Sequence, residues 1–200
     1  MRKFSLHIFI ISLIFLSMHV AYSADEPSSG SASSINLRSS YRELSISQVQ
    51  SIPNISIREK NDWGFYGHST INHNYNLRSI SGDKVVVDDA TGLMWHQSGT
   101  ETYTKYKEAK EWLEKLNRKG YAGCHDWRLP TVEEAASLLE SSKSNDLYID
   151  PVFSDKQRNI WTGDSKSGSE DVWNIHFSVA QMDRDDINSS HYVRPVRSMK

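Results

Sequence analysis

From residue 84 onward, hydrophobic and polar positions follow periodic patterns, and each pattern predicts one helix, strand or hairpin. The β-branched residues 85–87 and the apolar residues 93–95 flank the turn-forming sequence 88–92, a pattern typical of a β-hairpin. Near the C-terminus the period becomes two, because apolar side chains at the odd positions of 173–179 alternate with polar ones. This alternation predicts a half-buried strand.

Two further stretches show the three- and four-residue spacing of amphipathic helices. The first ends before Gly120 and carries its apolar side chains at Tyr106, Ala109, Trp112, Leu113 and Leu116. The second begins at Thr131, whose hydroxyl can accept a hydrogen bond from the N–H of Glu134 while the Glu134 carboxylate reaches back to Thr131. Its buried stripe runs to Leu139, and we expect the helix to end near Ser141.

Shorter strands are expected over residues 160–162 and 192–196. Pro195 has no N–H to donate to a strand ladder, so the last strand should lie at a sheet edge or carry a bulge. Helices in one block and antiparallel strands in another are typical of an α+β domain. The fold predicted over residues 82–200 is therefore α+β, with two main helices and a small antiparallel sheet.

The chain before this domain divides into three segments of different composition. Residues 1–23 combine a basic start, an apolar run at 8–16 and small residues near their end, which is the pattern of a cleaved signal peptide. Residues 24–34 are small and polar and predict a flexible leader. Residues 35–81 mix isolated apolar residues with polar ones, so we expect an irregular N-terminal extension. The expected localisation is export to the periplasm, cell surface or medium, with no membrane span once the signal is removed.

Charge and cysteine content exclude several classes of function. The 200 residues carry 23 Lys and Arg against 25 Asp and Glu, a net charge of −2, so no global positive field attracts nucleic acid. The single cysteine, Cys124, excludes an intrachain disulfide and a cysteine-rich zinc module. Zinc is not expected from the histidines either, because His68 and His73 lie in irregular chain and no paired helical spacing occurs.

Four motifs follow one another in the C-terminal part of the chain. They are Asp89–Trp95, Gly123–Thr131, Ile160–Thr162 and Tyr192–Arg197, with the first predicted helix between the first two. In this succession the chain resembles the Lcl C-terminal domain family, named after the Legionella collagen-like protein, over about residues 82–198. The resemblance implies a C-type-lectin-like scaffold related to that of formylglycine-generating enzymes. It also implies binding of sulfated glycans at surfaces, although this chain has no collagen-like Gly-X-Y segment.

The candidate ligand-binding residues form two groups. In the first, Trp127 could stack on a sugar ring and Arg128 could pair with a sulfate or carboxylate. The alternative is that both side chains hold the turn before the second helix by packing and internal hydrogen bonds. The second group, for ionic recognition of an anionic polymer, is Arg184, Arg194 and Arg197.

One acidic loop is a candidate calcium site. Asp183, Asp185, Asp186 and Asn188 offer oxygen ligands of the kind that calcium prefers. The loop lacks the glycine of an EF-hand and includes the cation Arg184, so a solvated acidic turn is the alternative. No other cofactor is expected.

The sequence predicts an exported, non-catalytic recognition domain that binds an extracellular polymer, with a glycan as the leading ligand. One alternative is a periplasmic or surface module for protein interaction or assembly. The other is an enzyme related to formylglycine-generating enzymes that uses Cys124. No catalytic residue is assigned, because the chain has neither a Gly-x-Ser-x-Gly elbow nor a glycine-rich phosphate loop.

Overall fold

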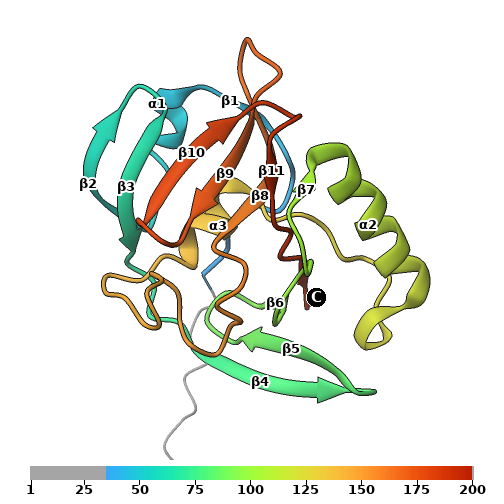
Figure 1. The fold of residues 1–200 in the computed structure, drawn as a ribbon. Coiled ribbons are helices and arrows are strands. Elements are labelled where there is room, and N and C mark those ends of the chain that lie inside the picture. Colours follow the sequence, from blue (N-terminus) through green and yellow to red (C-terminus); the bar gives the residue numbers. More distant parts are fainter. Residues whose placement is uncertain (1–34, 200) are drawn as a thin grey trace, which may run out of the picture. The chain divides into compact units, whose positions relative to one another are not determined.

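Strands are the main elements of the computed structural model, which describes residues 35–199. Strands take up 36% of the described residues and helices 16%. Figure 1 shows the sheets with the long helix α2 (Tyr106–Lys119) beside them. The expected signal peptide and the leader at 24–34 lie outside the described residues. Within residues 35–199, no helix is long and apolar enough to cross a membrane.

The larger sheet has six strands in the order β1-β8-β9-β10-β3-β2. These strands are β1 (Glu43–Leu44), β2 (Ile55–Asn61), β3 (Gly64–Ser69), β8 (Asn159–Lys166), β9 (Val172–His176) and β10 (Gln181–Asp185). Neighbouring strands are antiparallel, except that β1 and β8 are parallel. β8 contains the strand predicted at 160–162. β9 covers only the first part of the strand predicted at 173–179, because the chain turns before Ala180, which has a positive φ of 56°.

The smaller sheet has four strands in the order β12-β6-β5-β4. These strands are β4 (Tyr75–Ile80), β5 (Asp83–Asp88), β6 (Leu93–His96) and β12 (Val196–Ser198). β5 and β6 form the predicted β-hairpin, with Val87 opposite Met94. The hydrophobic pattern and the turn sequence between the two runs were therefore sufficient to identify this element.

The single strand predicted over 192–196 is wrong. β11 (Ser190–His191) pairs with β7 (Thr104–Lys105), and β12 begins only at Val196. Between them, the carbonyl of Pro195 accepts a hydrogen bond from the N–H of His96 at 2.9 Å. Since Pro195 has no N–H to return, the ladder is interrupted where the chain passes from one sheet to the other.

The predicted α+β, C-type-lectin-like architecture with two main helices and a small sheet is also wrong. α2 is the only helix of seven or more residues in the described chain, and it ends at Gly120 as expected. α3 (Val132–Ser137) has the predicted capping box at Thr131 but stops after six residues. The chain leaves the helix because the N–H of Glu140 donates to the carbonyl of Tyr148 at 3.0 Å instead of to the carbonyl of Ala136. A tertiary hydrogen bond thus replaces the next helical one.

Residues 35–81 are not irregular, contrary to the expectation from the sequence. They supply β1, β2 and β3 to the larger sheet, β4 to the smaller one, and the short helix α1 (Ile46–Val49), which Ser45 caps. β2 and β4 are edge strands, and most of their residues are exposed or only half-buried. Their sequences therefore lack the clear alternation by which a half-buried strand is recognised.

Two apolar clusters pack on opposite faces of the larger sheet, the second of them over Trp161 and Val172. The first packs α3 against Phe65, Trp173, Ile175 and Met182. The second lies on the side of α2 and includes Ala109, Leu113, Trp127 and Trp161. Consecutive residues of β8, Ile160 and Trp161, belong to different clusters, because successive side chains of a strand point to opposite faces.

One buried carboxylate joins the N-terminal segment to the rest of the fold. Asp164, at the irregular part of β8, is fully buried and accepts four hydrogen bonds. The Arg38 guanidinium donates two at 2.9 and 2.7 Å, and the backbone N–H groups of Arg42 and Val132 donate two at 2.6 and 2.7 Å. Arg38 also pairs with Glu133 at 3.1 Å. A buried carboxylate needs such partners, so these contacts fix residues 38–42 against α3.

Asp164→Ala should destabilise the protein strongly, because it leaves the buried Arg38 guanidinium and two backbone N–H groups without their acceptor. We expect the free energy of unfolding to fall by about 3–5 kcal/mol, measured by urea denaturation with tryptophan fluorescence. Asp62→Ala removes an exposed carboxylate and is the control, with an expected change below about 0.5 kcal/mol. Equal stability of the two variants would contradict the role given to Asp164.

Candidate functional site

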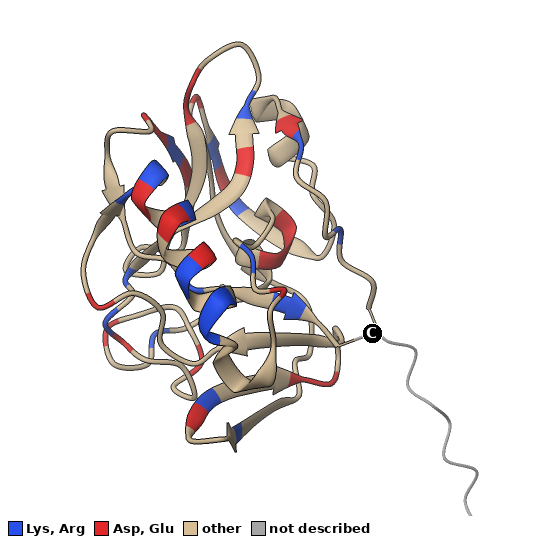
Figure 2. Ribbon diagram, turned by 90° about the vertical axis from the view of Figure 1, so that its right-hand side faces the viewer, with Lys and Arg blue, Asp and Glu red and all other residues tan. Residues whose placement is uncertain are grey.

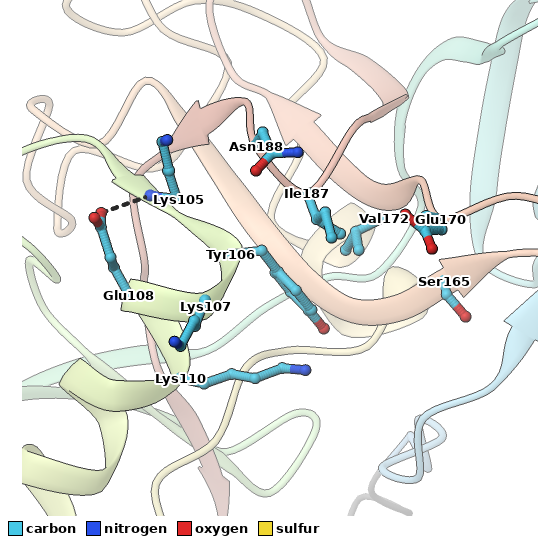
Figure 3. Close-up of a pocket in the computed structure, with 10 residues that line it drawn as sticks. All are labelled: Lys105, Tyr106, Lys107, Glu108, Lys110, Ser165, Glu170, Val172, Ile187 and Asn188. Atoms are coloured by element: carbon cyan, nitrogen blue, oxygen red, sulfur yellow. Dashed lines mark hydrogen bonds between the residues drawn. The ribbon is translucent and has the colours of Figure 1, made fainter.

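A pocket of about 510 Å³ lies where the start of α2 approaches β8 and the loops at 167–171 and 186–189. Figure 3 shows the ten residues around it: Lys105, Tyr106, Lys107, Glu108, Lys110, Ser165, Glu170, Val172, Ile187 and Asn188. Tyr106, Val172 and Ile187 provide its apolar part. Most of the surface that lines the pocket is apolar, and charged groups surround it. This composition is typical of a ligand site.

Three lysines give this pocket its cationic side. Lys105, Lys107 and Lys110 are all exposed, and the ammonium of Lys110 lies 4.3 Å from the centre of the Tyr106 ring. The Lys107 ammonium is 4.0 Å from the carboxylate of Glu111, a surface pair that contributes little and leaves the amine accessible. Burial raises the pKa of Tyr106, so its ring is a neutral phenol beside three cations.

Two glutamates in the pocket have different surroundings. The carboxylate of Glu108 accepts a hydrogen bond from the backbone N–H of Lys105 at 3.0 Å, which caps the start of α2 (Figure 3). This carboxylate is thus occupied by the helix end. Glu170 lies across the pocket in an exposed loop. The cations outnumber the acids in this pocket by three to two.

The helix presents Lys107 and Lys110 because of its amphipathic pattern, and Lys105 directly precedes it at the end of β7. Ala109, Leu113 and Leu116 are buried against the second apolar cluster. The opposite side of the helix must then face solvent, and its sequence there is rich in Lys and Glu. Figure 2 shows basic and acidic residues along the outward side of α2.

A second, smaller pocket of about 340 Å³ lies at the other end of α2. It is lined by His96, Trp112, Lys115, Leu116, Lys119 and Tyr121. The His96 ring stacks on Tyr121 with the ring centres 4.1 Å apart. Each end of the helix therefore combines lysines with aromatic side chains, and no pattern in the sequence pointed to these pockets as sites.

Both pockets lie inside a stretch that matches a known family. Residues 84–197 match the family described as the Lcl C-terminal domain, which is more than half of the chain. The chain belongs to the Lcl C-terminal domain family. Searches of curated proteins and of solved structures found no match. β1 to β4 precede the matched residues, so the larger sheet of this Lcl C-terminal domain is completed by strands from outside the match.

Trp127 and Arg128, proposed from the sequence as ligand contacts, hold the turn before α3. Trp127 is only 2% exposed, and its indole N–H donates to the carbonyl of Tyr121 at 2.9 Å. The Arg128 guanidinium donates two hydrogen bonds, both of 2.7 Å, to the buried carboxylate of Glu134. This geometry fits the alternative of packing and internal hydrogen bonding. Both residues also line a pocket of about 380 Å³, and ligand contact by them stays a prediction.

The other three candidate arginines also bind groups of the protein, Arg194 in the interior and Arg184 and Arg197 at half-buried positions. Arg194 is fully buried, and its guanidinium donates to the carbonyls of Gln97 and Ser154. Arg197 pairs with Asp126 at 2.7 Å, and Arg184 pairs with Asp171. The free cations of the Lcl C-terminal domain near a pocket are thus the lysines of α2 rather than these arginines.

The predicted calcium ligands are not gathered at one point. Asp183 accepts hydrogen bonds from Gln181 and from the N–H of Arg184. Asp186 accepts from the N–H and the side-chain amide of Asn188, at 2.7 and 2.9 Å. Calcium binding itself stays a prediction.

Only Asp185 of this predicted set takes part in a cluster of potential metal ligands. It lies with His176 and His191, and their donor atoms are within 4.8 Å of one another. Within residues 35–199, no other group of three His, Cys, Asp or Glu residues meets this distance. The two histidines are far apart in the sequence, so spacing rules could not bring them together.

His96 predicts a loss of stability in acid. Burial, and then the charge of Arg194, lower its pKa to about 4, against about 6.5 in an unfolded chain. As the pH falls between these values, the unfolded state takes up a proton that folded His96 does not, so the free energy of unfolding falls. His96→Gln should reduce the difference in stability between about pH 7 and about pH 4.5 by roughly 2–3 kcal/mol.

Urea denaturation at both pH values measures this effect. His125→Gln removes an exposed imidazole and is the matched control. The prediction fails if the His96 and His125 variants lose the same stability on acidification.

Proposed function

We propose that this protein is an exported, non-catalytic recognition protein that binds an anionic glycan of the extracellular medium or cell surface through the outward side of α2. The observation that carries the proposal is the group of Lys105, Lys107 and Lys110 around an apolar pocket that includes Tyr106. Sulfate or carboxylate groups of a glycan can pair with the ammonium groups, and the apolar faces of sugar rings can pack on the pocket.

Local charge supports this proposal better than overall charge does. The chain has a net charge of −2, which repels an anionic polymer weakly at long range. Residues 105–119, in contrast, hold six Lys and Arg but only three Glu. Attraction to such a patch is electrostatic and depends on ionic strength, since charges in solvent are screened within about 10 Å at 0.1 M salt.

The spacing of the two pockets favours a polymer over a single sugar. α2 has 14 residues, and such a helix is about 21 Å long. The pocket at its start and the pocket at its end each contain lysines and an aromatic ring. A polymer that follows the helix can contact both, which adds weak contacts within one chain.

The export part of the proposal rests on the sequence pattern of residues 1–23. The membership in the Lcl C-terminal domain family is consistent with it, because the resemblance noted from the motifs implies adhesion at surfaces. An enzymatic role through Cys124 has less support. Within residues 35–199, the only hydrogen bond of its thiol is to the carbonyl of Ala122 at 3.5 Å, so no base activates it.

A protein-interaction module is the second candidate function. β4 is an edge strand of the smaller sheet, and Leu77 on it is 53% exposed. An exposed edge can accept a strand from a partner protein. This candidate predicts binding that does not depend on polymer charge.

Binding to dextran sulfate and to uncharged dextran tests the glycan proposal. We expect the protein to bind dextran sulfate and not dextran, and to bind less tightly as the salt concentration rises. Lys107→Glu/Lys110→Glu should weaken the affinity about tenfold or more, because it replaces attraction at the pocket by repulsion. Surface plasmon resonance on immobilised polymer measures the change.

Lys60→Glu/Arg78→Glu is the matched control, since it changes the net charge equally at exposed positions on β2 and β4. An equal loss of affinity in both double variants would show that only net charge matters and would contradict a site on α2. No binding to the sulfated polymer by the folded protein would reject the glycan proposal and favour the protein partner.

A further inference from the structure

The face of the larger sheet opposite α3 carries a row of polar side chains. In β9 and β10, His176 is directly opposite Gln181, and Asn174 is directly opposite Asp183. Residues in opposite positions share a face, and alternation along β10 places Asp185 on that face too. Asn174 is nevertheless fully buried. The polar row is therefore buried at Asn174 and half-buried at His176, Asp183 and Asp185.

β11 places a second histidine next to this row. His191 is 3% exposed, and its Nε2 lies 2.9 Å from an oxygen of the Asp185 carboxylate. The rings of His176 and His191 are nearly perpendicular, with their centres 5.6 Å apart. Three separate strands thus bring two imidazoles and one carboxylate together, with their donor atoms within 4.8 Å of one another.

Two buried atoms at this place have no hydrogen-bond partner among residues 35–199. They are Nδ1 of His191 and Oδ1 of Asn174. Buried polar atoms are satisfied in the great majority of cases, and an exception calls for a reason such as a bound ion. Either ring nitrogen of His191 can serve as the ligand atom, because Nε2 faces the Asp185 carboxylate and no described residue holds Nδ1.

We infer that His176, Asp185 and His191 bind a divalent transition-metal ion of the zinc class. Two imidazoles and one carboxylate are a suitable ligand set, and three protein ligands leave the fourth position of zinc for water or a ligand. Calcium is a poor occupant, because it takes six to eight oxygen ligands. Arg184 alternates to the opposite face of β10, so its charge does not point into the site.

The distances between the donor atoms of His176, Asp185 and His191 require only a small approach of these side chains when a metal binds. Bonds of about 2.0–2.1 Å in a tetrahedron place the donor atoms about 3.3 Å apart. His191 and Asp185 already lie near this separation, at 2.9 Å. His176 is only half-buried, and the structure records no hydrogen bond of its ring with any described residue. Rotation of this one side chain can therefore complete the ligand set.

The Asn174 amide gives the site a supporting contact. Its nitrogen donates to the Asp185 carboxylate at 3.3 Å, and such contacts orient metal-binding carboxylates. The loop at 186–189 joins Asp185 to β11 and provides Ile187 and Asn188 to the pocket beside α2. A metal that links Asp185 to His191 thus closes the base of this loop. The inference does not depend on the proposed glycan binding.

Isothermal titration calorimetry of the purified untagged chain with Zn²⁺ tests the site. We expect one high-affinity equivalent of zinc, no comparable binding of Ca²⁺, and a higher melting temperature with zinc than with chelator. His176→Gln and Asp185→Asn should each weaken zinc binding by more than about tenfold. Loss of a residue that only supports a metal ligand already lowers metal affinity by about 10- to 100-fold, and these two residues are ligands themselves. His68→Gln removes another half-buried imidazole and should leave the affinity unchanged.

A measurement on the unaltered chain keeps the test decisive if the variants fold poorly. Bound Co²⁺ in a site with four ligands should give visible absorption bands that zinc abolishes by displacement. Zinc binding that is equal in the wild type and in the His176 and Asp185 variants would assign the ion to other residues and overturn the inference. Absence of both zinc heat and cobalt bands in the folded protein would overturn it as well, and would leave His191 and Asp185 as a hydrogen-bonded pair.

Discussion

The four hydrogen bonds to the buried Asp164 carboxylate are the constraint on which the arrangement of this domain depends. They join Arg38 and Arg42 from the N-terminal segment to Val132 at the start of α3. A charge at this depth is tolerated only with a full set of donors. The N-terminal segment is therefore an integral part of the fold, although it precedes the residues that match the Lcl C-terminal domain family. β1 follows directly and pairs with β8, the strand that carries Asp164.

The same requirement explains why the conspicuous arginines make hydrogen bonds and ion pairs within the protein. Arg128 and Arg194 lie in or near the interior, and each uses its guanidinium to satisfy a buried carboxylate or backbone carbonyls. The lysines of α2 have no such task, because the helix buries only its apolar side. Exposed ammonium groups beside apolar surface remain available for a ligand. Internal and external cations are thus separated by burial, and a sequence motif does not distinguish them.

The polar face of the larger sheet shows how function-bearing residues can be placed by strand register. Asn174 and His176 on β9 meet Asp185 on β10 and His191 on β11 only because the register of these strands places them on one side. The loop at 186–189 then connects this group to the pocket beside α2. A metal site and a glycan-binding surface at the two ends of one short loop would be mechanically linked, since the ion would hold the loop that lines the pocket.

The sequence by itself determined the elements whose signals are local. The β5–β6 hairpin, the helix α2 with its end at Gly120, and the capping box at Thr131 all follow from periodicity or from contacts within a few residues. Tertiary structure decided the rest, because strand pairing and side-chain neighbours depend on residues distant in the chain. It made strands of residues 35–81, shortened α3 through the hydrogen bond between Glu140 and Tyr148, and brought His176 to His191. Edge strands with half-exposed residues and clusters assembled from three strands leave no local pattern, so the fold class and the candidate sites were set by long-range pairing.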